Sequence, residues 1–117
     1  MRIEERMVGP VVVLDMAGRV VAGESQGRLK DKINSLTMQG RLQIVLNLGE
    51  VSYIDSTGLG ELVSSHSTVS RHGGRIKLLN LTKRVQDLLA ICRLSTVFET
   101  FDSEADAVSS FIVVSAM

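Results

Sequence analysis

The sequence predicts an α/β fold: a mixed, mostly parallel β-sheet with an antiparallel N-terminal hairpin and about four helices. Two β-rich runs, at 3–8 and 11–17, are separated by the turn pair Gly9-Pro10, which predicts the hairpin. Further along, strand-like apolar runs alternate with segments of helical apolar spacing. Strands that alternate with helices in this way form parallel crossover units, so the remaining strands are expected to be parallel.

In the first half of the chain, Gly18 is expected to end the second strand. A helix from about 24 to 38 follows, because its apolar side chains recur at four and three residues. These are Leu29, Ile33 and Leu36. Gly40 is placed as its C-terminal cap. The run LQIVLNL at 42–48 is nearly continuously apolar, which is typical of a strand covered on both faces, and it is placed in the middle of the sheet.

In the second half, four apolar side chains and one histidine at helical spacing indicate a helix, which ends at His72-Gly73-Gly74. They are Leu59, Leu62, Val63, His66 and Val69. RIKLLNL at 75–81 predicts a strand, with Lys77 near the rim of the sheet and tolerant of change. Thr82 is expected to cap a third helix, whose buried face would include Cys92. A short strand at 97–101 and a helix at 103–111 complete the expected elements.

Composition narrows the classes of function. The chain has 117 residues, which is the size of a single domain, expected to span 1–117. Its 13 Lys and Arg balance 13 Asp and Glu, so no overall positive field favours binding of nucleic acid. Its apolar runs are far shorter than the roughly 20 residues that cross a bilayer, so membrane insertion is not expected. Cys92 is the one cysteine, which fits a reducing compartment, and a cytoplasmic protein is expected.

Metal and nucleotide sites are not indicated. His66 and His72 are six positions apart and do not share a helix face, and Cys92 continues an apolar face. The chain lacks a phosphate-binding loop and a complete dinucleotide fingerprint, so no cofactor is expected. Ser56 is not preceded by the glycine of a hydrolase elbow. No catalytic residue is assigned, and a non-enzymatic binding module is favoured over an enzyme.

The stretch YIDSTGLGEL at 53–62 is the most informative one. An apolar strand ends, and the helix after it begins with two hydroxyl residues and two glycines, although each interior glycine costs a helix about 1 kcal/mol relative to alanine. Ser56 or Thr57 could cap the helix. Gly58 and Gly60 either pack the helix tightly on the sheet or leave the turn open to another molecule. In the second case Leu59 would be an isolated apolar contact.

The chain resembles the STAS domain, and in particular the stand-alone bacterial anti-sigma factor antagonists. Four features carry the resemblance: the order of the expected elements, NLGEVSYIDSTGLG at 47–60, Gly73-Gly74 before a strand, and KRVQDLLAICRLSTVF at 83–98. The resemblance implies the STAS fold and a role in transcription regulation. A protein of this kind binds an anti-sigma factor that is also a GHKL-type serine kinase and thereby releases a sigma factor. The kinase then phosphorylates the antagonist, and a PP2C-type phosphatase reverses the modification.

The resemblance also implies the functional residues. Ser56 matches the phosphorylated serine, and Thr57 is the alternative phosphorylation site. The partner-binding residues would lie in two segments: Arg19 and Val20; and Asp55, Ser56, Thr57, Gly58, Leu59 and Gly60. The chain departs from the family at Val21, where an acidic residue often stands. An alternative is an unphosphorylated STAS scaffold or regulatory subunit, in a stress-signalling complex or an ABC lipid-transport system. The sequence leaves open whether the domain forms a homodimer.

Overall fold

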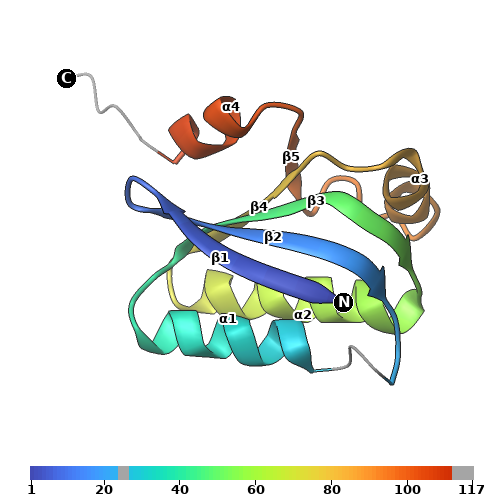
Figure 1. Ribbon diagram of the computed structural model, residues 1–117, viewed down its shortest axis with the longest axis horizontal. Coiled ribbons are helices and arrows are strands. Elements are labelled where there is room, and N and C mark those ends of the chain that lie inside the picture. Colours follow the sequence, from blue (N-terminus) through green and yellow to red (C-terminus); the bar gives the residue numbers. More distant parts are fainter. Residues whose placement is uncertain (24–26, 112–117) are drawn as a thin grey trace.

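The computed structural model describes residues 1–23 and 27–111. In this part of the chain, five strands form one sheet in the order β1-β2-β3-β4-β5. Figure 1 shows how they are arranged. β1 is antiparallel to β2, and β2 to β5 are mutually parallel, so the predicted fold class is confirmed. The strands are β1 (Arg2–Val8), β2 (Val11–Val20), β3 (Gln43–Ile54), β4 (Arg75–Leu79) and β5 (Glu99–Phe101). β3 is the middle strand, as the apolar run at 42–48 predicts.

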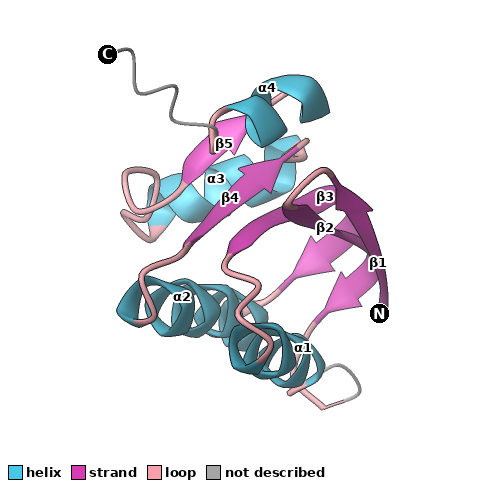
Figure 2. Cartoon of the chain, turned by 90° about the vertical axis from the view of Figure 1, so that its left-hand side faces the viewer, coloured by secondary structure: helices cyan, strands magenta, loops and turns pink. Residues whose placement is uncertain are grey.

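Four helices accompany the sheet: α1 (Arg28–Met38), α2 (Ser56–Arg71), α3 (Lys83–Ile91) and α4 (Glu104–Ser109). α1 and α2 lie side by side on one face, α4 lies on the other, and α3 lies at the end of the sheet where β3 finishes (Figures 1 and 2). The expected start of α1 at residue 24 falls on residues 24–26, which are outside the described part of the chain. Within the described part, no helix is long and apolar enough to span a membrane.

Both faces of the central strands are buried. Val12, Leu14 and Met16 of β2 belong to the larger core cluster, which α1 and α2 cover. Their neighbours Val11 and Val13 point to the other face and join a smaller cluster with residues of β3, β4 and α4. Because successive strand residues point to opposite faces, a strand covered on both sides must be apolar throughout. This explains the continuous apolar run of β2 as well as that of β3.

The strands β2 and β3 run further than expected. β2 continues through Gly18 to Val20, and β3 continues past Leu48 to Ile54. Gly18 has a φ of 94°, and the pairing of β2 with β3 shifts register between Gly18 and Arg19. Gly18 is therefore a strand irregularity of the kind that bends a strand without ending it. After the shift, Arg19 pairs with Tyr53.

Lys77 and Cys92 lie in surroundings opposite to those expected. Lys77 is only 4% exposed, and its Nζ donates hydrogen bonds to Oγ of Ser110 at 2.8 Å and to the Ser110 carbonyl at 3.3 Å. The same ammonium lies 3.4 Å from a carboxylate oxygen of Glu99 and 4.4 Å from the ring centroid of Phe111. Cys92 is exposed and lies just past α3, which ends at Ile91.

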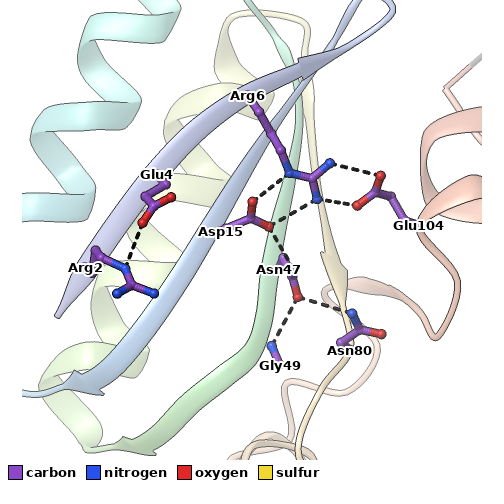
Figure 3. A network of polar contacts seen from close by, with 8 residues as sticks. All are labelled: Arg2, Glu4, Arg6, Asp15, Asn47, Gly49, Asn80 and Glu104. Carbon is purple, nitrogen blue, oxygen red and sulfur yellow. Dashed lines mark hydrogen bonds and ion pairs between the residues drawn. The ribbon is translucent and has the colours of Figure 1, made fainter.

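A polar cluster ties α4 to the first hairpin (Figure 3). The Arg6 guanidinium donates to Asp15 through Nε at 2.6 Å and to Glu104 through Nη1 at 3.0 Å. Asn47 of β3 donates to the same Asp15 carboxylate at 2.8 Å. The hydrogen bonds from Arg6 lower the pKa values of both Asp15 and Glu104, and both carboxylates in turn raise the pKa of Arg6. We refer to these four residues as the Arg6 cluster.

Candidate functional site

The first turn of α2 is built on Asp55. Asp55 has extended backbone dihedrals and is the N-cap of the helix: its Oδ1 accepts a hydrogen bond from the Gly58 amide at 2.8 Å. Its Oδ2 accepts from the Ala22 amide at 3.1 Å, and its own amide donates to the Val20 carbonyl at 3.2 Å. The hydrogen bonds from Gly58 and Ala22 lower the pKa of Asp55. One carboxylate thus joins the start of α2 to the end of β2.

The hydroxyls of Ser56 and Thr57 are both on the surface, in the first turn of α2. Because Asp55 is the cap, the reading in which Ser56 or Thr57 caps the helix is wrong. Neither hydroxyl makes a hydrogen bond within the described part of the chain, so neither is needed to complete the helix end. The Ser56 side chain is therefore open to a second molecule.

The two glycines of the turn have different roles. A Cβ added at Gly58 would lie 2.1 Å from the Val20 carbonyl oxygen, well inside contact distance, so α2 starts directly against β2 because this residue has no side chain. A Cβ added at Gly60 would meet nothing within 4 Å, and Gly60 is exposed. Gly58 therefore allows α2 to pack tightly on the sheet, whereas Gly60 leaves the surface of the turn open.

Leu59 is 5% exposed and belongs to the larger core cluster. The expectation of an isolated apolar contact at this position is therefore wrong. The side chains of Arg19, Ser56 and Thr57 face solvent, and Asp55 is half-buried. Val20, at 1% exposure, is packed inside. The contacts of Asp55 and Gly58 with the end of β2 bring the two predicted partner-binding segments together at one end of the sheet.

Sequence reasoning missed the side chains next to this turn. Two guanidinium groups lie over the Tyr53 ring, with Cζ of Arg19 at 5.5 Å and Cζ of Arg84 at 5.2 Å from the ring centroid. A cation over an aromatic face is attracted by the ring quadrupole. Tyr53 is the single tyrosine of a chain with few aromatics, and Lys83 and Arg84 follow the cap Thr82 directly. The sequence shows the single tyrosine and the basic pair at 83–84, but it does not show that Tyr53 and Arg84 lie next to each other in the fold.

The remaining titratable side chains do not build a second site. His66 is partly buried and stacks edge-on against Phe98 with ring centroids 5.1 Å apart. Its Nδ1 is without a hydrogen-bond partner in the described structure. Across residues 1–23 and 27–111, no three side chains of the metal-ligating types come together.

Comparison with known proteins places this arrangement in a family. The family model described as the STAS domain matches residues 2–107. The anti-sigma-B factor antagonist of Bacillus subtilis (strain 168) is 37% identical over 83 residues, which cover 68% of this chain and 75% of that protein. The anti-sigma F factor antagonist of Paenibacillus polymyxa is 29% identical over 72 residues, 62% of each chain.

Solved structures share the fold. A crystal structure of a candidate anti-sigma factor antagonist from Thermotoga maritima has a TM-score of 0.85 at 23% identity and covers 92% of both chains. The Bacillus cell fate determinant SpoIIAA in its phosphorylated form has a TM-score of 0.74 at 21% identity, covering 94% of this chain and 99% of that one. SpoIIAA is also known in its unphosphorylated form, with a TM-score of 0.72.

Proposed function

Because this chain belongs to the STAS domain family, we propose that it is an anti-sigma factor antagonist switched by phosphorylation of Ser56. In the unmodified state it binds an anti-sigma factor and so releases a sigma factor. That anti-sigma factor is a serine kinase of the GHKL type, and phosphate on Ser56 ends the binding. A PP2C-type phosphatase restores the unmodified state. The domain is proposed to act in the cytoplasm as a binding module without catalysis of its own.

The observation that carries this proposal is the exposed, uncommitted hydroxyl of Ser56 beside a cap made by Asp55. A kinase can reach this hydroxyl without opening the helix. The hydroxyl also lies in the first turn of α2, where the helix dipole favours negative charge. The domain can therefore carry a phosphate and stay folded.

The relatives support the same assignment. The curated proteins that match over most of their length are named for antagonism of anti-sigma factors. The similar structure of SpoIIAA has been solved in a phosphorylated and an unphosphorylated form, which shows that one STAS fold holds both states. A serine phosphate adds about −1.5 to −2 charge and three acceptor oxygens. At a surface in close contact with a partner, this charge must be desolvated, and the complex is weakened.

The test compares Ser56→Ala with Ser56→Asp in calorimetry against the purified cognate anti-sigma factor. Ser56→Ala adds no charge and removes no cap, so it should bind like the wild type and change the free energy of unfolding by no more than about 0.5 kcal/mol. Ser56→Asp places a carboxylate in the turn and should bind at least several-fold more weakly, with a melting temperature close to that of the wild type. Incubation with the kinase and ATP should add one phosphate, which mass spectrometry should locate on Ser56.

Two matched variants make the result specific. Ser64→Asp puts the same charge on an exposed residue further along α2 and should leave the affinity unchanged. Thr57→Ala should still be phosphorylated, whereas Ser56→Ala should not. Equal affinities of Ser56→Ala and Ser56→Asp for the partner would show that the switch is not at this residue, and wild-type protein that fails to bind the anti-sigma factor would overturn the function as a whole.

A further inference from the structure

The end of β3, the helix α3 and the first turn of α2 lie at the same end of the molecule (Figure 1). A groove lies between the end of β3 and α3. It has a volume of about 540 Å³. Its lining comes from the end of β3 (Tyr53 and Ile54) and from α3 (Lys83, Arg84, Asp87, Leu88 and Ile91). We call it the Tyr53 groove. It is separate from the Ser56 hydroxyl and is not part of the phosphorylation switch described above.

The Tyr53 groove is cationic although the chain as a whole is neutral. Arg84 lies in its wall and Arg19 stands beside it, each against the Tyr53 ring. In the described part of the chain, neither guanidinium forms an ion pair. Lys83 has one carboxylate nearby, that of Asp87 at 3.5 Å, and both of those side chains are largely exposed. Two cations and one acid therefore line the groove, and a third cation, Arg19, lies beside it.

The position of two of these cations is unfavourable for the helix that carries them. Lys83 and Arg84 lie in the first turn of α3, and this turn contains no acidic residue. The N-terminus of a helix has a positive dipole end, so cations there are repelled and acids are preferred. Residues that break a local rule of this kind are expected at functional sites, where a partner compensates for the cost. A negatively charged partner would do so here.

The groove also presents an apolar side chain. Ile91, in its wall, is 78% exposed, and Tyr53 is 37% exposed. A partner that covered both would bury apolar surface that is now in contact with water. The chemistry that fits the groove is thus a carboxylate for the guanidinium groups, held next to an apolar side chain that packs on Ile91.

We propose that the Tyr53 groove binds a segment of the anti-sigma factor in which acidic residues flank an apolar side chain. This inference rests on the proposed function and adds the second contact surface and the charge of the partner. The charge pairs would steer the encounter and select the partner, and the apolar contact would lengthen the life of the complex.

The test measures the affinity for the purified cognate anti-sigma factor by calorimetry at low and at high salt. Arg84→Glu should weaken binding at least tenfold and should flatten the decrease of affinity with salt, because a screened attraction has been removed. The control is Arg71→Glu, the same charge change at the last residue of α2, whose 16-residue length places it roughly 22 Å from Ser56. It should change the affinity by less than twofold.

The folding of the two charge variants separates binding from stability. Arg84→Glu puts an acid at a helix N-terminus and should not lower the melting temperature, whereas Arg71→Glu removes a favourable cation from a helix C-terminus and should lower it slightly. Arg84→Glu should therefore be the variant with weaker binding, and Arg71→Glu the variant with lower stability. For the apolar contact, Ile91→Ser should weaken binding at least fivefold, and Met38→Ser, at an 88% exposed residue of α1, should not.

The outcomes distinguish this inference from the function on which it rests. A wild-type protein that binds the anti-sigma factor, together with Arg84→Glu and Ile91→Ser that bind as well as their controls, would overturn the groove and leave the function standing. A wild-type protein that does not bind would overturn both. A homodimer in size-exclusion chromatography that Arg84→Glu dissociates, with unchanged affinity for the anti-sigma factor, would show that a second copy of the chain occupies the groove and that the proposal is wrong.

Discussion

Asp55 and Ser56 are neighbours in the chain but serve separate purposes. The Asp55 carboxylate accepts hydrogen bonds from the backbone amides of Gly58 and Ala22 and so holds α2 against the end of β2. The Ser56 side chain makes no such contact and faces solvent. Because the cap and the proposed acceptor are different residues, a phosphate can be added at Ser56 without removing the hydrogen bonds that fix the turn.

The two glycines of the turn give a prediction at the scale of single residues. Gly58→Ala should destabilise the domain by at least about 2 kcal/mol, because its Cβ would meet a backbone oxygen of Val20 that cannot move aside freely. Gly60→Ala should stabilise it by about 0.5–1 kcal/mol, because an exposed helical glycine loses more backbone entropy on folding than alanine does. Urea unfolding of both variants measures the difference. A similar sign for both would mean that α2 does not begin as close to β2 as the structure shows.

At the scale of elements, α4 is attached to the sheet through buried polar contacts as well as apolar ones. Ala107 packs with Val11 and Val13 of β2, and Lys77 of β4 reaches Ser110 just past the end of the helix. α4 is only six residues long, too short to be stable alone. Its presence therefore depends on what it contacts.

Lys77→Ala tests that dependence. It should lower the free energy of unfolding by about 1–3 kcal/mol, because a buried side chain is removed together with its hydrogen bonds to Ser110. Backbone amides of α4 should also exchange faster with solvent. Lys30→Ala, at an exposed lysine of α1, is the control and should stay within about 0.5 kcal/mol of the wild type. If both variants unfolded alike, Lys77 would not hold α4.

The elements that could be predicted are those that carry a local signal. The apolar run at 42–48 and the leucines of α2 repeat at strand and helix periods, and both elements lie where those periods place them. The burial of Lys77 could not be predicted, because it depends on the contact with Ser110 at the end of α4, which is remote in sequence. The residue type does not identify the cap, because Asp, Ser and Thr are all good caps; the extended backbone of Asp55 and its bond from the Gly58 amide do.

At the scale of the whole molecule, the Arg6 cluster joins the first strand to the last helix. Arg6 and Glu104 are 98 positions apart in sequence, and their side chains form a two-pronged hydrogen-bonded pair (Figure 3). The side chains of Arg6, Asp15 and Glu104 are 35–39% exposed, so water screens these pairs. Each is expected to contribute about 0.2–1 kcal/mol.

The contribution of the Arg6 cluster to stability should depend on pH. Since Arg6 lowers the pKa values of Asp15 and Glu104 below their ordinary 3.8 and 4.5, the folded state binds fewer protons than the unfolded state in that range. The stabilisation is thus fully present above about pH 5 and is lost as the pH falls through the lowered values. Arg6→Gln should be less stable than the wild type at pH 7, and the gap should narrow below about pH 4. Urea unfolding at both pH values measures it. Arg2→Gln, which breaks an exposed pair with Glu4, should show no such gap, and a gap of constant size for Arg6→Gln would contradict the assignment.

The same long-range pair has a consequence for protein synthesis. A ribosome adds roughly 5–20 residues per second, so Glu104 is made about 5–20 s after Arg6. Towards the end of that interval β1, β2 and β3 have been made, and the apolar face formed by Val11, Val13 and Val45 has no helix to cover it. This face is then the surface that a chaperone, or a neighbouring nascent chain, meets first. Nascent chains stalled before α4 should accordingly be captured by a chaperone that binds apolar segments, and chains stalled well after it should escape.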